Sequence, residues 1–216
     1  MKLKDKKNFL IDLDGVILDT KYDNYFWQNY IPKIYAQRKN ISNEDAVKIT
    51  HGIFNYKRKS KDWYDIDYWS NILNIDIAEE KKKSENMERM SVIKGSLDTL
   101  KKLKDQGINL YLITNAHRKT LEIKLQKFPI TKYFIYIICS HELSYIKEDI
   151  QFWHILKNKI NVDLNKTVLI EDTYDNIVSA HHAGIDSLVY ISKNIKPADN
   201  IEVLQINALS DILTSL

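Results

Sequence analysis

The chain of 216 residues contains a single cysteine, Cys139, so it can form no disulfide within itself. A protein without disulfides fits a reducing compartment, and we therefore expect it in the cytoplasm. Long hydrophobic runs are also lacking. The longest covers residues 133–139, far below the ~20 apolar residues that a membrane span needs. The N-terminus begins with basic residues, but acids soon interrupt its short apolar stretch, which argues against a signal peptide.

Neither sign of charge dominates the sequence. Its 32 lysines and arginines and 29 acids leave a formal net charge of +3, too small an excess to predict a nucleic-acid partner. The histidines and the cysteine form no H-E-x-x-H or Cys/His pattern, so we expect no zinc site. The length predicts one large domain, or one domain that carries an insert.

Short segments with nearly continuous apolar residues stand out in the sequence. They cover residues 9–13, 109–114, 133–140, 167–172 and 187–192. Continuous rather than alternating apolar residues are typical of strands buried on both faces, as in a parallel sheet. Helical patterns lie between the later strands, at residues 96–107, 119–128, 149–160 and 174–184. This alternation predicts an α/β fold built on a doubly wound parallel sheet, with right-handed crossovers.

The interval between the first two predicted strands has a different character. It covers roughly 75 residues, far more than an ordinary connection between two strands. Helical patterns recur in it, and it shows no strand pattern. We therefore predict a helical cap domain at residues 21–93, inserted into a core domain of residues 1–20 and 94–216. Within the insert, we interpret the charged run at residues 79–85 as a solvated helix face.

Polar residues follow four of the predicted strands in chain order. These are Asp12 and Asp14, then Thr114 and Asn115, then Lys147, and finally Glu171 and Asp172. Because the carboxyl ends of parallel strands meet at one edge of a sheet, we expect these side chains to converge there. Four carboxylates cannot all stay ionised in one cleft without a cation, and ligands that are all oxygens favour Mg²⁺.

A phosphate group suits this set of side chains. The cation, Lys147 and the hydroxyl and amide of Thr114 and Asn115 offer it positive charge and hydrogen-bond donors. A carboxylate such as Asp12 can attack phosphorus as a nucleophile. Asp14, two residues further on, can then protonate the leaving oxygen and later activate water.

Four segments of the sequence resemble the four motifs of the haloacid dehalogenase superfamily, in the same order and spacing. They are "DLDGV" with Asp12 and Asp14, "LITN" with Thr114, "KEDIQFW" with Lys147 and "LIEDT" with Asp172. The insert after the first motif resembles the C1 cap of that superfamily. The segments "DNYFWQ", "DWYDIDYWS", "LITNAH" and "YIKEDIQFWH" are similar to its GMP/IMP 5′-nucleotidase branch.

This resemblance implies a Mg²⁺-dependent phosphomonoesterase that hydrolyses GMP or IMP to nucleoside and phosphate through an aspartyl-phosphate. It implies that the side chain of Asp12, the carbonyl of Asp14 and Asp172 hold the metal, while Glu171 either ligates the ion or supports the site. Thr114 and Lys147 would bind the phosphoryl oxygens. Asn115 and His117 are the further candidates for binding the small-molecule substrate. The sequence predicts neither the exact substrate nor the oligomeric state.

Two positions depart from the family pattern, and several alternatives compete with it. Glu148 stands where a proline often follows the motif lysine, and Asn176 stands where many members carry a second acid. A dehalogenase needs neither a metal nor an acid at the position of Asp14. A sugar-phosphate phosphatase or phosphomutase shares every motif and differs in the cap. A receiver-like signalling domain lacks a cap, and the intact motifs argue against a non-catalytic binding relative.

Overall fold

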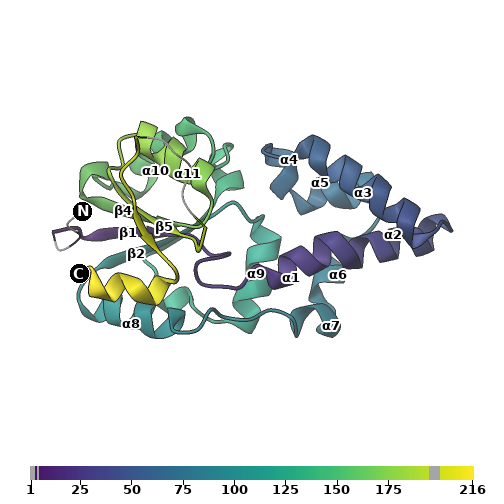
Figure 1. The fold of residues 1–216 in the computed structure, drawn as a ribbon, viewed down its shortest axis with the longest axis horizontal. Coiled ribbons are helices and arrows are strands. Elements are labelled where there is room, and N and C mark those ends of the chain that lie inside the picture. The colour runs from purple at the N-terminus through teal and green to yellow at the C-terminus, as the bar shows by residue number, and fades with distance from the viewer. Residues whose placement is uncertain (1–2, 4, 195–199) are drawn as a thin grey trace. The chain divides into compact units, whose positions relative to one another are not determined.

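The computed structural model describes residues 3, 5–194 and 200–216 (Figure 1). Contacts within the chain divide it into two compact units. The sheet unit comprises Met1–Asp19, Val92–Asn115 and Pro129–Leu216, and the helical unit comprises Thr20–Ser91 and Ala116–Phe128. None of the helices in the described ranges is long and apolar enough to cross a membrane.

Six parallel strands form one sheet in the sheet unit, in the order β3-β2-β1-β4-β5-β6. Their bounds are β1 (Asn8–Ile11), β2 (Asn109–Thr114), β3 (Tyr136–Cys139), β4 (Thr167–Glu171), β5 (Ser187–Ile191) and β6 (Leu204–Ile206). The doubly wound parallel sheet predicted from the sequence is thereby confirmed. The short strand β6 was not predicted.

Helices α10 (Ile150–Ile160) and α11 (Tyr174–His182) cover one face of this sheet, and α8 (Ser96–Asp105) lies on the other (Figure 1). Leu10 of β1 pairs with Tyr111 of β2 and with Leu169 of β4, and all three belong to the core beneath α10 and α11. The residues that alternate with them, such as Phe9 and Ile11, are buried as well. Both faces are therefore covered, which explains the continuous apolar pattern.

Every regular element between Thr20 and Ser91 is helical. The helices are α1 (Lys21–Tyr25), a π-helical turn (Phe26–Tyr30), α2 (Ile31–Lys39), α3 (Asn43–Lys57), α4 (Lys61–Tyr64), α5 (Ile66–Leu73), α6 (Ile77–Lys82) and α7 (Ser84–Met87). Asp65 and Asp76 begin α5 and α6, because their carboxylates accept hydrogen bonds from backbone N–H groups of the first helical turn. Phe26, Phe54 and Trp69 pack together in the core of this unit.

Helix α9 (Arg118–Lys127) differs from the domain boundaries that we predicted. The sequence assigned it to the core domain, whereas its contacts place it in the helical unit. Lys124 of α9 forms an ion pair with Asp23, and Lys127 donates to the carbonyls of Met87 and Met90. These bonds, made by side chains that look like surface lysines in the sequence, attach α9 to the inserted helices.

An ion-pair cluster of two buried lysines and the partly exposed Asp23 lies at the centre of these contacts. Asp23 accepts hydrogen bonds from Lys81 at 2.9 Å and from Lys124 at 2.5 Å, and the two lysine side chains are only 1% and 2% exposed. The ammonium of Lys81 also lies 4.3 Å from the ring centroid of Phe26 and 4.8 Å from that of Tyr22. The aromatic faces thus add to the stabilisation that Asp23 gives the Lys81 ammonium.

This cluster overturns the interpretation of residues 79–85 as a solvated face, because Glu80 and Lys81 are buried. Burial by itself raises the pKa of the Asp23 carboxyl. The ammonium groups of Lys124 and Lys81 outweigh that effect and hold the pKa below its ordinary value.

We predict that Asp23→Asn destabilises the protein strongly, because it removes the carboxylate that the buried ammonium groups of Lys81 and Lys124 share. Removing one partner of a buried ion pair costs about 3–5 kcal/mol of the free energy of unfolding. Glu44→Gln is the control, since Glu44 and Lys48 form an exposed pair on one helix, and its effect should be small. Urea unfolding of the variants measures both effects. Equal, small losses would contradict a structural role for the cluster.

Candidate active site

The loop that follows β1 begins the site. The backbone N–H of Asp12 still donates to the carbonyl of Ile170 at 3.0 Å, so Asp12 continues the pairing with β4 by one residue. The chain then turns at Gly15, whose φ is +82°. A side chain at this position would place its Cβ 1.9 Å from Oδ2 of Asp172. The glycine therefore allows both the left-handed turn and the close approach of the Asp172 carboxylate.

The end of β4 supplies the second set of carboxylates. Glu171 is the last residue of the strand and is fully buried. Its Oε1 accepts the backbone N–H groups of Asp172 at 3.1 Å and Thr173 at 3.0 Å. Its Oε2 accepts a hydrogen bond from Lys147 at 2.7 Å. Both oxygens of Glu171 are therefore engaged by donors of the protein itself.

Lys147 connects the strand ends with one another. Its ammonium donates to Oδ1 of Asp12 at 2.5 Å, to Oε2 of Glu171 at 2.7 Å and to the carbonyl of Ile113 at 3.3 Å. The residue is only 2% exposed. A buried ammonium is stable only when acceptors surround it, and here they come from the ends of β1, β4 and β2.

Asn115 holds the backbone of the same lysine. Its Oδ1 accepts the N–H of Lys147 at 2.9 Å, and its Nδ2 donates to Oε2 of Glu148 at 2.8 Å. The two bonds orient the Asn115 amide unambiguously. Glu148, which departs from the family pattern in the sequence, thus has a defined contact in the structure.

The electrostatics of the site favour a bound cation. Burial is the main cause that raises the pKa of Asp12, to about 7, and Glu171 and Asp14 raise it further against the effect of Lys147. Burial, Glu171 and Asp12 raise the pKa of Asp172 to about 9. Burial lowers the pKa of Lys147, but Asp12 and Glu171 outweigh it and keep the ammonium charged. One ammonium cannot neutralise three ionised carboxylates, so without a cation the raised pKa values keep protons on these carboxyl groups, and a bound cation would take the place of those protons.

The chemistry of the donors fits a hard divalent ion. Asp12, Glu171 and Asp172 each offer a carboxylate oxygen, and these oxygens lie within 4.8 Å of one another. Oxygen donors without nitrogen or sulfur suit Mg²⁺, and a small ion between Asp12 and Asp172 would relieve their mutual repulsion. The donor set therefore fits the metal that the sequence implied.

The structure brings together most of the residues selected from the sequence. Asp12, Lys147, Glu171, Asp172 and Asn115 form one bonded or contacting group. Thr114 is the buried last residue of β2, and Asp14 lies near enough to Asp12 to affect its pKa. His117 lies instead in the helical unit.

The surroundings of His117 form a network of charged groups. Its Nε2 lies 3.9 Å from Oδ1 of Asp65 and 4.0 Å from Oδ2 of Asp67. These three residues have the composition of a metal site. However, the ammonium of Lys119 lies 2.7 and 2.8 Å from the two oxygens of Asp67, and Oδ1 of Asp65 caps α5. The Lys119 ammonium supplies positive charge to these two carboxylates, and we interpret the group as an ion-pair network.

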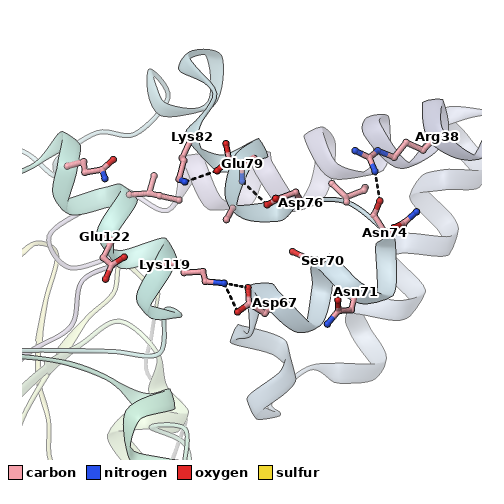
Figure 2. A pocket seen from close by; sticks show the side chains of 14 residues that line it. Arg38, Asp67, Ser70, Asn71, Asn74, Asp76, Glu79, Lys82, Lys119 and Glu122 are labelled. Atoms are coloured by element: carbon pink, nitrogen blue, oxygen red, sulfur yellow. Dashed lines mark hydrogen bonds and ion pairs between the residues drawn. The ribbon is translucent and has the colours of Figure 1, made fainter.

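A cavity of about 670 Å³ lies beside this network in the helical unit (Figure 2). Polar side chains from α2, α5, α6 and α9 line it. Its three cationic side chains are bound already: Lys119 pairs with Asp67, Lys82 with Glu79, and Arg38 donates to the carbonyl of Asn74. Figure 2 shows these three interactions as dashed lines. The positive charges of this cavity are thus already paired with acceptors of the protein.

Sequence reasoning missed three residues of the site. Gly15 could have been identified from the sequence, because a glycine directly after Asp14, just past a predicted strand, indicates a tight turn. Trp153 and Ser179, which bind the carbonyl of Lys147, occupy ordinary buried positions on α10 and α11 and carry no such signal.

Fold and site together define an α/β protein with a carboxylate–lysine site at the carboxyl edge of a parallel sheet. The family model for haloacid dehalogenase-like hydrolases matches residues 9–190, and the chain belongs to this family. The family supports phosphatase activity, as the names of several relatives illustrate.

One curated relative is a GMP/IMP nucleotidase of Escherichia coli, 28% identical over 182 residues, which cover 84% of this chain and 81% of the relative. Other relatives include pyrophosphatases and phosphoglycolate phosphatases. The family chemistry therefore occurs with several substrates.

Solved structures share the fold. A haloacid dehalogenase-type phosphatase from Thermococcus onnurineus superposes with a TM-score of 0.82 at 20% identity and covers 96% of each chain. A hydrolase of the same type from Bacillus subtilis, solved with bound magnesium, superposes with a TM-score of 0.71 at 18% identity, over 97% of each chain.

Substitution of Gly15 should damage the site through Asp172. We predict that Gly15→Ala lowers the turnover of a phosphomonoester at least about tenfold and raises the Mg²⁺ concentration needed for half-maximal activity, because its Cβ displaces the Asp172 carboxylate. Gly107→Ala is the matched control. Gly107 has a φ of +77°, and its Cβ would meet no atom within 4 Å. Steady-state kinetics of both variants decide, and equal activity would contradict the role assigned to Gly15.

Proposed function

We propose that the protein is a Mg²⁺-dependent phosphomonoesterase that hydrolyses purine nucleoside monophosphates, with GMP and IMP as preferred substrates. The observation that carries the proposal is the buried ammonium of Lys147 between Asp12 and Glu171, beside the carboxylate of Asp172. A site with excess carboxylates, a fixed ammonium and room for a cation suits the transfer of a phosphoryl group.

Asp12 is the nucleophile in this proposal. One oxygen of its carboxylate forms a bond to phosphorus while the bond from phosphorus to the ester oxygen breaks. Asp14 gives a proton to that ester oxygen, and the alcohol leaves. Asp14 then takes a proton from water, the water oxygen attacks phosphorus, and the acyl-phosphate bond breaks to release phosphate and restore Asp12.

The other side chains position and stabilise these groups. Lys147 holds Oδ1 of Asp12, which leaves the second carboxylate oxygen to attack. Lys147 and Thr114 bind the phosphoryl oxygens. The side chains of Asp12 and Asp172 and the carbonyl of Asp14 hold Mg²⁺, while Glu171 supports the site, since donors of the protein occupy both of its oxygens. Bound Mg²⁺ supplies positive charge that neutralises the phosphoryl group.

The choice of nucleotides rests on two supports. The first is the similarity to the GMP/IMP nucleotidase, together with the sequence segments that resemble this branch. The second is the helical unit, which carries half-buried aromatic side chains at Trp63, Tyr64 and Tyr68 on which a purine can stack. Asn115 and His117, two residues apart in the chain, are the candidates for further contacts to the substrate.

Chelation tests the metal. We predict that excess EDTA abolishes the release of phosphate and that added Mg²⁺ restores it, because the carboxylates need a counter-ion. Ca²⁺ should restore little, since its larger and looser coordination shell disturbs the in-line geometry. Full activity in excess chelator would contradict the phosphatase mechanism and favour a dehalogenase.

A substrate panel tests the specificity. We predict that kcat/KM for IMP and GMP exceeds that for UMP and glucose 6-phosphate by roughly tenfold to two-hundredfold, the range that an apolar or stacking contact provides. A hydrogen bond to O6 of the purine would add discrimination against AMP. Release of phosphate from each compound at several concentrations gives the comparison. If a sugar phosphate is the best substrate, the nucleotidase assignment is wrong and only the phosphatase chemistry remains.

A further inference from the structure

The carbonyl of Lys147 receives two hydrogen bonds from buried side chains. The indole N–H of Trp153 donates to it at 2.9 Å, and the hydroxyl of Ser179 donates to it at 2.7 Å. Trp153 is fully buried and Ser179 is 6% exposed. The same indole N–H also donates to Oγ of Ser179 at 2.6 Å, so its one hydrogen is shared between the carbonyl and the hydroxyl. Trp153 lies on α10 and Ser179 on α11, so two different helices converge on one backbone oxygen.

The same lysine is held at its other polar groups. Its N–H donates to Asn115, which follows β2, and its ammonium binds Asp12 and Glu171. Glu171 ends β4, and α11 with Ser179 follows β4 directly in the chain. Strand β4 and the following helix α11 therefore hold Lys147 at both ends: Glu171 binds its ammonium, and Ser179 binds its carbonyl. These two bonds restrict the position of the lysine side chain.

We propose that Trp153 and Ser179 are positioning residues, which fix the backbone of Lys147 so that its ammonium meets Oδ1 of Asp12. The inference rests on the proposed phosphatase function, because it assigns the two residues an effect on phosphoryl transfer. Neither residue touches the reacting groups. Without their hydrogen bonds the carbonyl of Lys147 is buried with fewer donors, and the segment around it shifts to find others.

A small shift of this kind has a large kinetic effect. Misplacement of a catalytic group by about 1 Å can cost about a hundredfold in rate. The lysine would keep its charge and its burial, but its ammonium would no longer match the position of Asp12. We therefore expect a lower kcat in variants that remain folded.

Two substitutions remove the donors separately. Trp153→Phe keeps an aromatic ring and removes the N–H, and Ser179→Ala removes the hydroxyl. Each should lower kcat about tenfold, and because the two residues bind each other and the same carbonyl, the double variant should lose less than the product of the two effects. The substrate is a phosphomonoester that the wild-type protein hydrolyses, and the thermal midpoint of each variant confirms that it is folded.

Matched controls remove similar groups elsewhere. Thr167→Val removes a buried hydroxyl that donates to the carbonyl of Asp163 at 2.7 Å, at the opposite end of β4 from Glu171. Thr99→Val removes a second buried hydroxyl, which donates to the carbonyl of Gly95 at 2.9 Å at the start of α8. Both should keep kcat within about twofold of wild type, since neither group contacts Lys147.

Ser179→Thr separates positioning from packing. If the hydroxyl at position 179 positions Lys147, Ser179→Thr retains this donor, and the kcat of that variant should lie well above that of Ser179→Ala. If only the volume of the side chain affects the rate, the added methyl group gives Ser179→Thr a lower kcat than Ser179→Ala. Trp153→Phe gives a second, independent reading should the threonine variant fail to fold.

The outcomes separate this inference from the function on which it rests. An active wild-type protein with unchanged kcat in Ser179→Ala and Trp153→Phe overturns the positioning role and leaves the phosphatase assignment standing. An order of kcat in which Ser179→Ala equals or exceeds Ser179→Thr overturns it as well. A wild-type protein that hydrolyses no phosphomonoester overturns the proposed function and the inference together.

Discussion

The contact between the Lys147 ammonium and the carboxylates of Asp12 and Glu171 is the interaction on which the site depends. It joins the ends of β1 and β4 to the segment that follows β3. This is possible because β1 lies in the middle of the sheet, between β2 and β4. A parallel sheet with this strand order brings residues that are far apart in the chain to one edge, and the buried lysine then determines their distances.

The charge balance of this group also explains its chemistry. Burial of carboxyl groups is unfavourable, and the raised pKa values of Asp12 and Asp172 express that cost. One ammonium compensates part of the charge, and the remainder favours a divalent cation. Gly15 makes the arrangement sterically possible, because any side chain there would collide with Asp172. In the proposed function, a divalent cation would neutralise these carboxylates and would in turn attract the anionic phosphoryl group.

Much of the fold could be predicted from the sequence, because buried parallel strands leave a continuous apolar pattern. Strand β6 was not predicted, because three residues are too few to show a strand pattern in the sequence. The residues that follow the strands, such as Asp12 and Lys147, could be predicted because a parallel sheet brings the segments after its strands to one edge. The assignment of α9 could not, since the bonds of Lys124 and Lys127 depend on tertiary contacts. The contacts of Trp153 and Ser179 with Lys147 could not be predicted for the same reason, because the sequence does not show which carbonyl a buried tryptophan or serine binds.

The central claim is that Asp12 forms a covalent bond to phosphorus. Rapid acid quenching during turnover, followed by mass spectrometry of the peptide that contains residue 12, tests it most directly. The account predicts a phosphoryl group on Asp12 during turnover of the wild-type protein, and neither this adduct nor phosphate release in folded Asp12→Asn. Turnover that continues in Asp12→Asn, or a phosphoryl group found on another residue, would contradict the account.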